Sequence, residues 1–180
     1  MDWKRFFKAL FFIFVLAFGF AQPAFGQTGT VVRVSPDYQE VDPGETFSVA
    51  IEIDNVTDLY GFDVAISYDP AAIALDHAVY GEFLEIGIGL PADEAPGTAR
   101  CILSQTSPQE PKSGSGTLCI FYFVAGDSDG ESDLTFNLIE LSDRDGKILT
   151  TETANGFVQI GEPKSGSEVY IPLFLAGGGK

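Results

Sequence analysis

The chain has few of the side chains on which most enzymes and nucleic-acid-binding proteins depend. Its 180 residues include one histidine, one tryptophan and two cysteines, and only 10 basic residues stand against 26 acidic ones. The formal net charge of −16 excludes binding to a phosphate backbone as a main function, because a basic patch is needed to displace counterions. Binding to an anionic membrane surface is excluded for the same reason.

The single histidine restricts the possible chemistry. His77 is followed by the apolar residues Ala78 and Val79, and we expect it to lie in a loop rather than to act as a base. The sequence contains no Gly-x-Ser-x-Gly elbow, so a Ser–His–Asp triad is not supported. One histidine and two cysteines without ligand spacing argue against zinc. We therefore expect no catalytic residues and no enzyme activity.

Calcium is the one cofactor that the sequence leaves open. The segment 127–133 clusters carboxylates, which suit a hard cation, and its candidate ligands are Asp127, Asp129 and Asp133. The EF-hand spacing is not met, because Gly130 comes too early and the twelfth-position glutamate is missing. A solvated turn is therefore the preferred interpretation, with calcium as the weaker alternative.

The N-terminal segment has the pattern of an export signal. Three basic residues within the first eight positions precede the apolar stretch 9–21, and Ala24-Phe25-Gly26 has small residues at the −3 and −1 positions. We predict cleavage after Gly26, since a bilayer-spanning helix needs roughly 20 apolar residues. The remaining chain would have a formal charge of 7 − 25 = −18. We expect an extracellular protein, secreted or associated with the cell surface.

Short apolar runs with period-two alternation, broken by Gly, Pro, Asp and Asn, fill the chain from residue 30 to residue 160. This spacing is typical of strands. We expect nine strands, of which 78–84 is the weakest, and a β-sandwich rather than an α/β fold. The predicted strands cover 30–35, 47–53, 61–68, 78–84, 99–104, 116–124, 134–141, 147–150 and 156–160.

The composition changes after Ile160. Residues 161–167 have the composition of a flexible linker, and Val169–Ala176 (VYIPLFLA) is an apolar tail that is too short to span a membrane. We therefore divide the chain into a signal peptide at 1–26, a β-sandwich at 27–160, and a linker with a short apolar tail at 161–180.

Four segments, in this order, resemble a cohesin domain, the sandwich module that binds dockerins in cellulosomes and related surface assemblies. They are VDPGETFSV at 41–49, GFDVAISYDP at 61–70, GTLCIFYF at 116–123 and NGFV at 155–158. The resemblance covers residues 31–160 and implies an all-β, nine-stranded jelly-roll sandwich, in agreement with the strand count. It also implies a secreted, non-catalytic module whose partner is a dockerin-like protein in a polysaccharide-degrading or surface assembly.

The resemblance implies a binding face on the sheet that holds the family's third, fifth, sixth and eighth strands. By position, Asp63 matches the family's interfacial aspartate, Ile102 would face the partner, and Gln105 falls where relatives can carry an acid. Gly61 stands where cellulosomal cohesins often carry asparagine. That departure puts ordinary cellulosomal specificity in doubt.

The segment 116–124 has apolar side chains in both phases of a strand. One phase must build the core, and the other leaves an apolar patch on the outer sheet, which marks an interaction site. We predict an interface centred on Asp63, Ile102, Ile120 and Tyr122, with coverage of this face by the tail at 169–176 as the alternative. The two phases are Cys119, Phe121, Phe123 and Leu118, Ile120, Tyr122.

Export would place the two cysteines where a disulfide can persist. Cys101 and Cys119 lie on the predicted fifth and sixth strands, which should pair antiparallel because they are consecutive. If the loop between them is centred near Glu110, residues whose numbers sum to about 220 face each other, as these do; the family alignment implies that both point inward. A disulfide would contribute about 3 kcal/mol, and two buried free thiols are the alternative.

Direct binding of polysaccharide is the alternative function. Such binding usually needs aromatic faces on which sugar rings stack, and the chain has no tryptophan after residue 26. Tyr38, Tyr60 and Tyr80, which fall near predicted loops, are the candidate platform.

Overall fold

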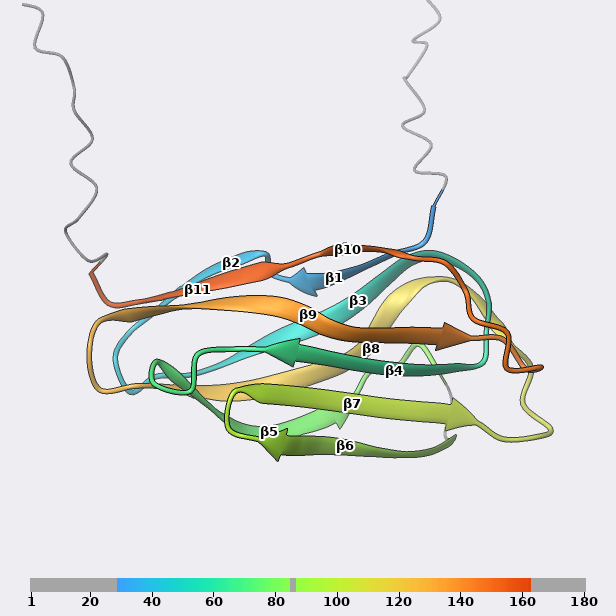
Figure 1. Ribbon diagram of the computed structural model, residues 1–180, viewed down its shortest axis with the longest axis horizontal. Coiled ribbons are helices and arrows are strands. Elements are labelled where there is room, and N and C mark those ends of the chain that lie inside the picture. The colour runs from blue at the N-terminus through green and yellow to red at the C-terminus, as the bar shows by residue number, and fades with distance from the viewer. Residues whose placement is uncertain (1–28, 85–86, 163–180) are drawn as a thin grey trace, which may run out of the picture.

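The computed structural model describes residues 29–84 and 87–162, and all regular structure in these ranges is β (Figure 1). The predicted signal peptide and the apolar tail lie outside the described residues. Within the described ranges, no helix is long and apolar enough to cross a membrane. The strands are β1 (Val31–Ser35), β2 (Tyr38–Val41), β3 (Thr46–Leu59), β4 (Gly61–Ser67), β5 (Ile73–Tyr80), β6 (Gly87–Ala95), β7 (Thr98–Gln105), β8 (Lys112–Ala125), β9 (Gly130–Ser142), β10 (Glu152–Ala154) and β11 (Gly156–Ile160).

The strands form two sheets that pack face to face. The five-stranded sheet has the order β10-β1-β3-β8-β5, and the six-stranded sheet has the order β2-β11-β9-β4-β7-β6. Neighbouring strands pair antiparallel, except that β1 with β10 and β2 with β11 are parallel. In Figure 1, β9, β4, β7 and β6 lie side by side in one layer. The predicted all-β jelly-roll sandwich is confirmed.

The eleven strands amount to nine extended stretches, the number predicted, once two sheet-switching stretches are recognised. Only Pro36 and Asp37 separate β1 from β2, and only Asn155 separates β10 from β11, yet the members of each pair belong to different sheets. Each pair is one extended stretch that passes from one sheet to the other, as strands do at the corners of a sandwich. The fold therefore contains nine extended stretches.

Some individual strand predictions are wrong. The fourth stretch, β5, spans Ile73–Tyr80 rather than 78–84, and the segment 147–150 makes only an isolated bridge from Ile148 to Ser142. The prediction also missed β6, because Gly87, Gly89 and Pro91 interrupt its apolar alternation. An edge strand tolerates such residues, since a proline there removes no hydrogen bond from the ladder interior, and β6 is at the edge of its sheet.

The core lies between the sheets, where each long strand presents one apolar phase. Phe121 and Phe123 of β8 are fully buried and lie opposite Val49 and Phe47 of β3. The Phe123 ring stacks on Phe47 at 5.6 Å between centroids and meets Tyr68 edge-on at 5.2 Å. Each such ring stabilises the fold by about 1.5–3 kcal/mol through apolar burial, so β8 is a major contributor to the core.

Truncating one of these rings should cost most of the marginal stability of the domain. We expect Phe121→Ala to lower the free energy of unfolding by about 3–5 kcal/mol, because it removes buried area and leaves a cavity. The control is Ile148→Ala at a side chain that is 59% exposed, for which the change should stay below about 0.5 kcal/mol. Urea denaturation measures both, and equal losses would contradict this description of the core.

Candidate functional site

The candidate site is the outer surface of four adjacent strands, β6, β7, β4 and β9 (Figure 1). Burial of Val64, Cys101 and Leu103 in the core turns the residues between them outward, because side chains alternate along a strand. We call this surface the Asp63 face. It carries Asp63 from β4, Arg100, Ile102 and Ser104 from β7, Ile88 from β6, and Leu138 and Glu140 from β9.

An ion pair lies at the centre of the Asp63 face. Arg100 donates from Nη2 to Asp63 Oδ2 at 2.5 Å and from Nε to Asp63 Oδ1 at 2.7 Å. This two-pronged geometry is the strong form of the arginine–carboxylate pair and fixes both side chains. The register places Ile102 on one side of Asp63 and Glu140 on the other. The centre therefore holds two carboxylates and one guanidinium. The side chain of Asp63 is 15% exposed and that of Arg100 is 29% exposed.

The edge of the Asp63 face formed by β6 and β7 is apolar. Ile88 is 76% exposed and Ile102 is 36% exposed. Their strands lie close together because Gly89 has no side chain: a Cβ there would lie 2.0 Å from the Ile102 carbonyl oxygen. Large aliphatic side chains left open beside a charged centre mark an interaction surface.

The structure brings together two of the four residues predicted to centre the interface. Asp63 and Ile102 are register partners on β4 and β7. Ile120 and Tyr122 lie on β8, on the outer side of the other sheet, so a single interface formed by all four is wrong. The cause is the missed strand β6, which shifted the numbering of β7, β8 and β9 by one. Counted over the nine stretches, the third, fifth, sixth and eighth are β4, β6, β7 and β9, which are neighbours in one sheet.

Gln105 does not reach the Asp63 face, so its prediction as a partner contact is wrong. It belongs to the inward phase of β7 and is 3% exposed. Its backbone N–H donates to the Tyr60 carbonyl oxygen at 2.9 Å, while the side-chain Oε1 and Nε2 have no hydrogen-bond partner.

The outer side of the five-stranded sheet carries a second, separate apolar surface. Ile120, Tyr122 and Val124 follow one another along the outward phase of β8, and the His77 ring stacks on Tyr122 at 4.3 Å between centroids. His77 lies in β5 rather than in a loop, and its Nδ1 is 2.8 Å from a carboxylate oxygen of Asp76. We call this surface the Tyr122 face.

The three candidate sugar-binding tyrosines do not form one platform. Tyr38 stacks on Phe157 of β11, beside the beginning of β9, whereas Tyr60 lies near the end of β9 beneath the guanidinium of Arg144. Tyr80 donates its hydroxyl proton to a backbone carbonyl oxygen of β7 at 3.0 Å.

The three candidate calcium ligands do not converge either. Asp127 Oδ1 lies near Gly44, Asp129 Oδ1 lies against Gly161, and Asp133 belongs to β9. Among residues 29–84 and 87–162, no three acidic, histidine or cysteine side chains are grouped so that they could hold a metal ion.

The two cysteines lie in different sheets. Cys101 is on β7, which pairs with β4 and β6, and Cys119 is on β8, which pairs with β3 and β5. The predicted antiparallel pairing of their strands is therefore wrong. Both side chains are fully buried and are free thiols.

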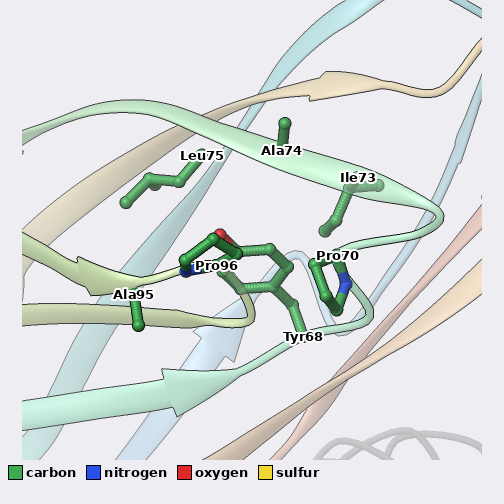
Figure 2. Close-up of a pocket in the computed structure, with 7 residues that line it drawn as sticks. All are labelled: Tyr68, Pro70, Ile73, Ala74, Leu75, Ala95 and Pro96. Atoms are coloured by element: carbon green, nitrogen blue, oxygen red, sulfur yellow. The ribbon is translucent and has the colours of Figure 1, made fainter.

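A small cavity, one of several, opens between the start of β5 and the turn from β6 to β7. It has a volume of about 280 Å³, and Figure 2 shows the Tyr68 ring between Pro70 and Pro96. None of the side chains that line it is charged. Tyr68 contributes the only side-chain hydroxyl group of this lining.

Comparison with known proteins identifies the family. The family model of the cohesin domain matches residues 32–160, and this chain belongs to the cohesin domain family. No curated protein matches the chain.

Solved cohesins share its fold at low identity. The non-cellulosomal cohesin of the hyperthermophilic archaeon Archaeoglobus fulgidus is 20% identical, with a TM-score of 0.63 over 74% of this chain and 92% of that one. The sixth cohesin of scaffoldin B from Acetivibrio cellulolyticus, solved with a Cel5 dockerin, is 15% identical, with a TM-score of 0.66 over 74% and 100%. The seventh ScaB type I cohesin from Pseudobacteroides cellulosolvens is 19% identical, with a TM-score of 0.63 over 75% and 94%.

The ion pair of the Asp63 face should couple measurably to stability. A double-mutant cycle of Asp63→Asn and Arg100→Met should give a coupling free energy of about 1–2 kcal/mol, because both hydrogen bonds are charge-assisted and partly shielded from water. The matched control is the pair Arg144–Glu110, with an N–O distance of 3.4 Å and side chains 42% and 80% exposed. Its coupling should stay below about 0.5 kcal/mol. Equal coupling free energies in the two urea-denaturation cycles would contradict the claim that the Asp63–Arg100 pair is stronger than an exposed surface ion pair.

Proposed function

We propose that this chain is an exported, non-catalytic binding module whose Asp63 face docks a dockerin. The observation that carries the proposal is the open surface of β6, β7, β4 and β9, with the Asp63–Arg100 pair at its centre and Ile88 and Ile102 exposed at its edge. Membership of the cohesin family supports it. So does the similar cohesin from Acetivibrio cellulolyticus, which was solved with a dockerin.

The size of the surface suits a small partner. Four strands about 4.8 Å apart, with paired stretches of seven to eight residues, make a face of roughly 20 by 25 Å, or about 500 Å². A standard interface buries about 800 Å² on each partner. A compact module that covers the Asp63 face and the loops beside it would reach that area.

The chemistry of the surface indicates what the partner presents. Aliphatic side chains would cover Ile88 and Ile102, and hydrogen-bond donors or cations would face Asp63 and Glu140. The negative charge of the chain would also steer a basic partner toward it. Gly61 has no side-chain amide such as an asparagine would offer. A Cβ at this position would lie 3.2 Å from Ser142 Oγ, a tight contact. We therefore propose a dockerin specificity that differs from that of cohesins with an asparagine at this position.

We also propose that the protein acts outside the cell, in a polysaccharide-degrading or surface assembly. The export-signal pattern at residues 1–26 supports this location. The assembly need not be a cellulosome, since the similar archaeal cohesin is described as non-cellulosomal.

Calorimetric titration with the dockerins encoded in the same genome tests the binding proposal. We expect Ile102→Asp to weaken dockerin binding at least about 100-fold, because it would bury an unpaired charge in an apolar contact. Ile120→Asp is the matched control, since it makes the same change on the Tyr122 face, and it should alter the affinity less than about threefold. Thermal denaturation of both variants establishes that they are folded.

Two results would contradict the proposal. One is that no dockerin binds the wild-type chain, and the other is that Ile120→Asp weakens binding as much as Ile102→Asp. Retention on cellulose or xylan, measured beside the titration, tests the alternative function. Retention without any dockerin binding would favour a carbohydrate-binding module.

A further inference from the structure

The two cysteines come from opposite sheets and lie in the same part of the core. Cys101 lies in the middle of β7, and Cys119 lies on β8. Each is 0% exposed and packed in the core between the sheets. Tyr80 of β5 connects their surroundings, because it is the register partner of Cys119 and its hydroxyl donates to the carbonyl oxygen of Ile102, next to Cys101. Sheet packing rather than strand pairing therefore brings the two side chains together.

The surroundings of the thiols protect them once the protein is folded. Burial raises the pKa of Tyr80 to about 12, with smaller contributions from both cysteines. Burial also raises the pKa of the Cys119 thiol, assisted by the hydrogen bond to Cys101. Because the thiolate is the reacting species, the buried Cys119 thiol should exchange slowly once the protein is folded.

We propose that Cys101 and Cys119 form a disulfide that joins the two sheets when the chain folds in an oxidising compartment. The reaction is exchange with a disulfide oxidant, either a small molecule or an oxidoreductase. The cysteine pair loses two electrons and two protons and gains one S–S bond, while the oxidant's S–S bond breaks and its two sulfurs leave as thiols. This inference concerns the core and does not depend on dockerin binding.

The bond would anchor the strand that carries the proposed binding residues. Cys101 lies between Arg100 and Ile102, which point to the opposite side of β7. Linking Cys101 to Cys119 would hold the inner side of β7 against β8 and close the loop from 102 to 118. Closing a loop of this length should raise the melting temperature by about 10 °C.

Refolding under two redox conditions tests the inference. The chain is unfolded with reductant and then refolded either with oxidised glutathione or under anaerobic reducing conditions. After refolding with the oxidant, we expect a monomer whose intact mass is about 2 Da lower, with no thiol open to alkylation after denaturation. The reduced sample should have two such thiols and melt about 10 °C lower.

The double variant C101A/C119A is the matched control, and its melting temperature should be the same in both conditions. The inference is overturned if the native, oxidised monomer still has two thiols that react after denaturation. It is also overturned if the disulfide is found only in covalent dimers or in material without native β-structure. Dockerin binding by the reduced protein is measured separately, so failure of the disulfide and failure of the proposed function remain distinguishable.

Discussion

Apolar packing between the two sheets decides which side chains reach the outside of the sandwich. Val64 and Cys101 are fully buried, so their chain neighbours Asp63, Arg100 and Ile102 must face outward. Because side chains alternate with a period of two, a one-residue slip of β4 or β7 would bury the ion pair and expose core residues. The register that the core enforces on these two strands is thus the condition for the whole Asp63 face.

The two outer surfaces of the sandwich differ in what they offer a partner. The Asp63 face combines a pre-formed ion pair with open isoleucines, and the Tyr122 face is an apolar stripe on which His77 is stacked. Apolar contact supplies most of the affinity of an interface, whereas fixed charges select the partner and its orientation. An arginine that already holds Asp63 in place reduces the ordering that binding would require. The Asp63 face therefore has both elements of a specific docking surface.

The sequence predicted the fold well and the site only in part. Strong alternation at 47–53, 61–68 and 116–124 made those strands evident, and the resemblance to cohesins, carried over by position, pointed to Asp63 in the second of them. The glycines and the proline of β6 hid that strand, so β7 and β8 were assigned one place too early. That shift put Ile120 on the wrong face. The cysteines were placed in a hairpin because β7 and β8 are consecutive in the chain, whereas the structure puts these two strands in different sheets. Gln105 could have been excluded, because it lies four residues after Cys101 and shares its inward phase.

The central claim is that a dockerin binds the Asp63 face and leaves the Tyr122 face free. Methyl-labelled isoleucine NMR reports on both faces in one titration, since Ile88 and Ile102 lie on the first and Ile120 on the second. The account predicts that the methyl signals of Ile88 and Ile102 shift or broaden as dockerin is added, while that of Ile120 stays in place. A shift of Ile120 with unchanged Ile88 and Ile102 would contradict it.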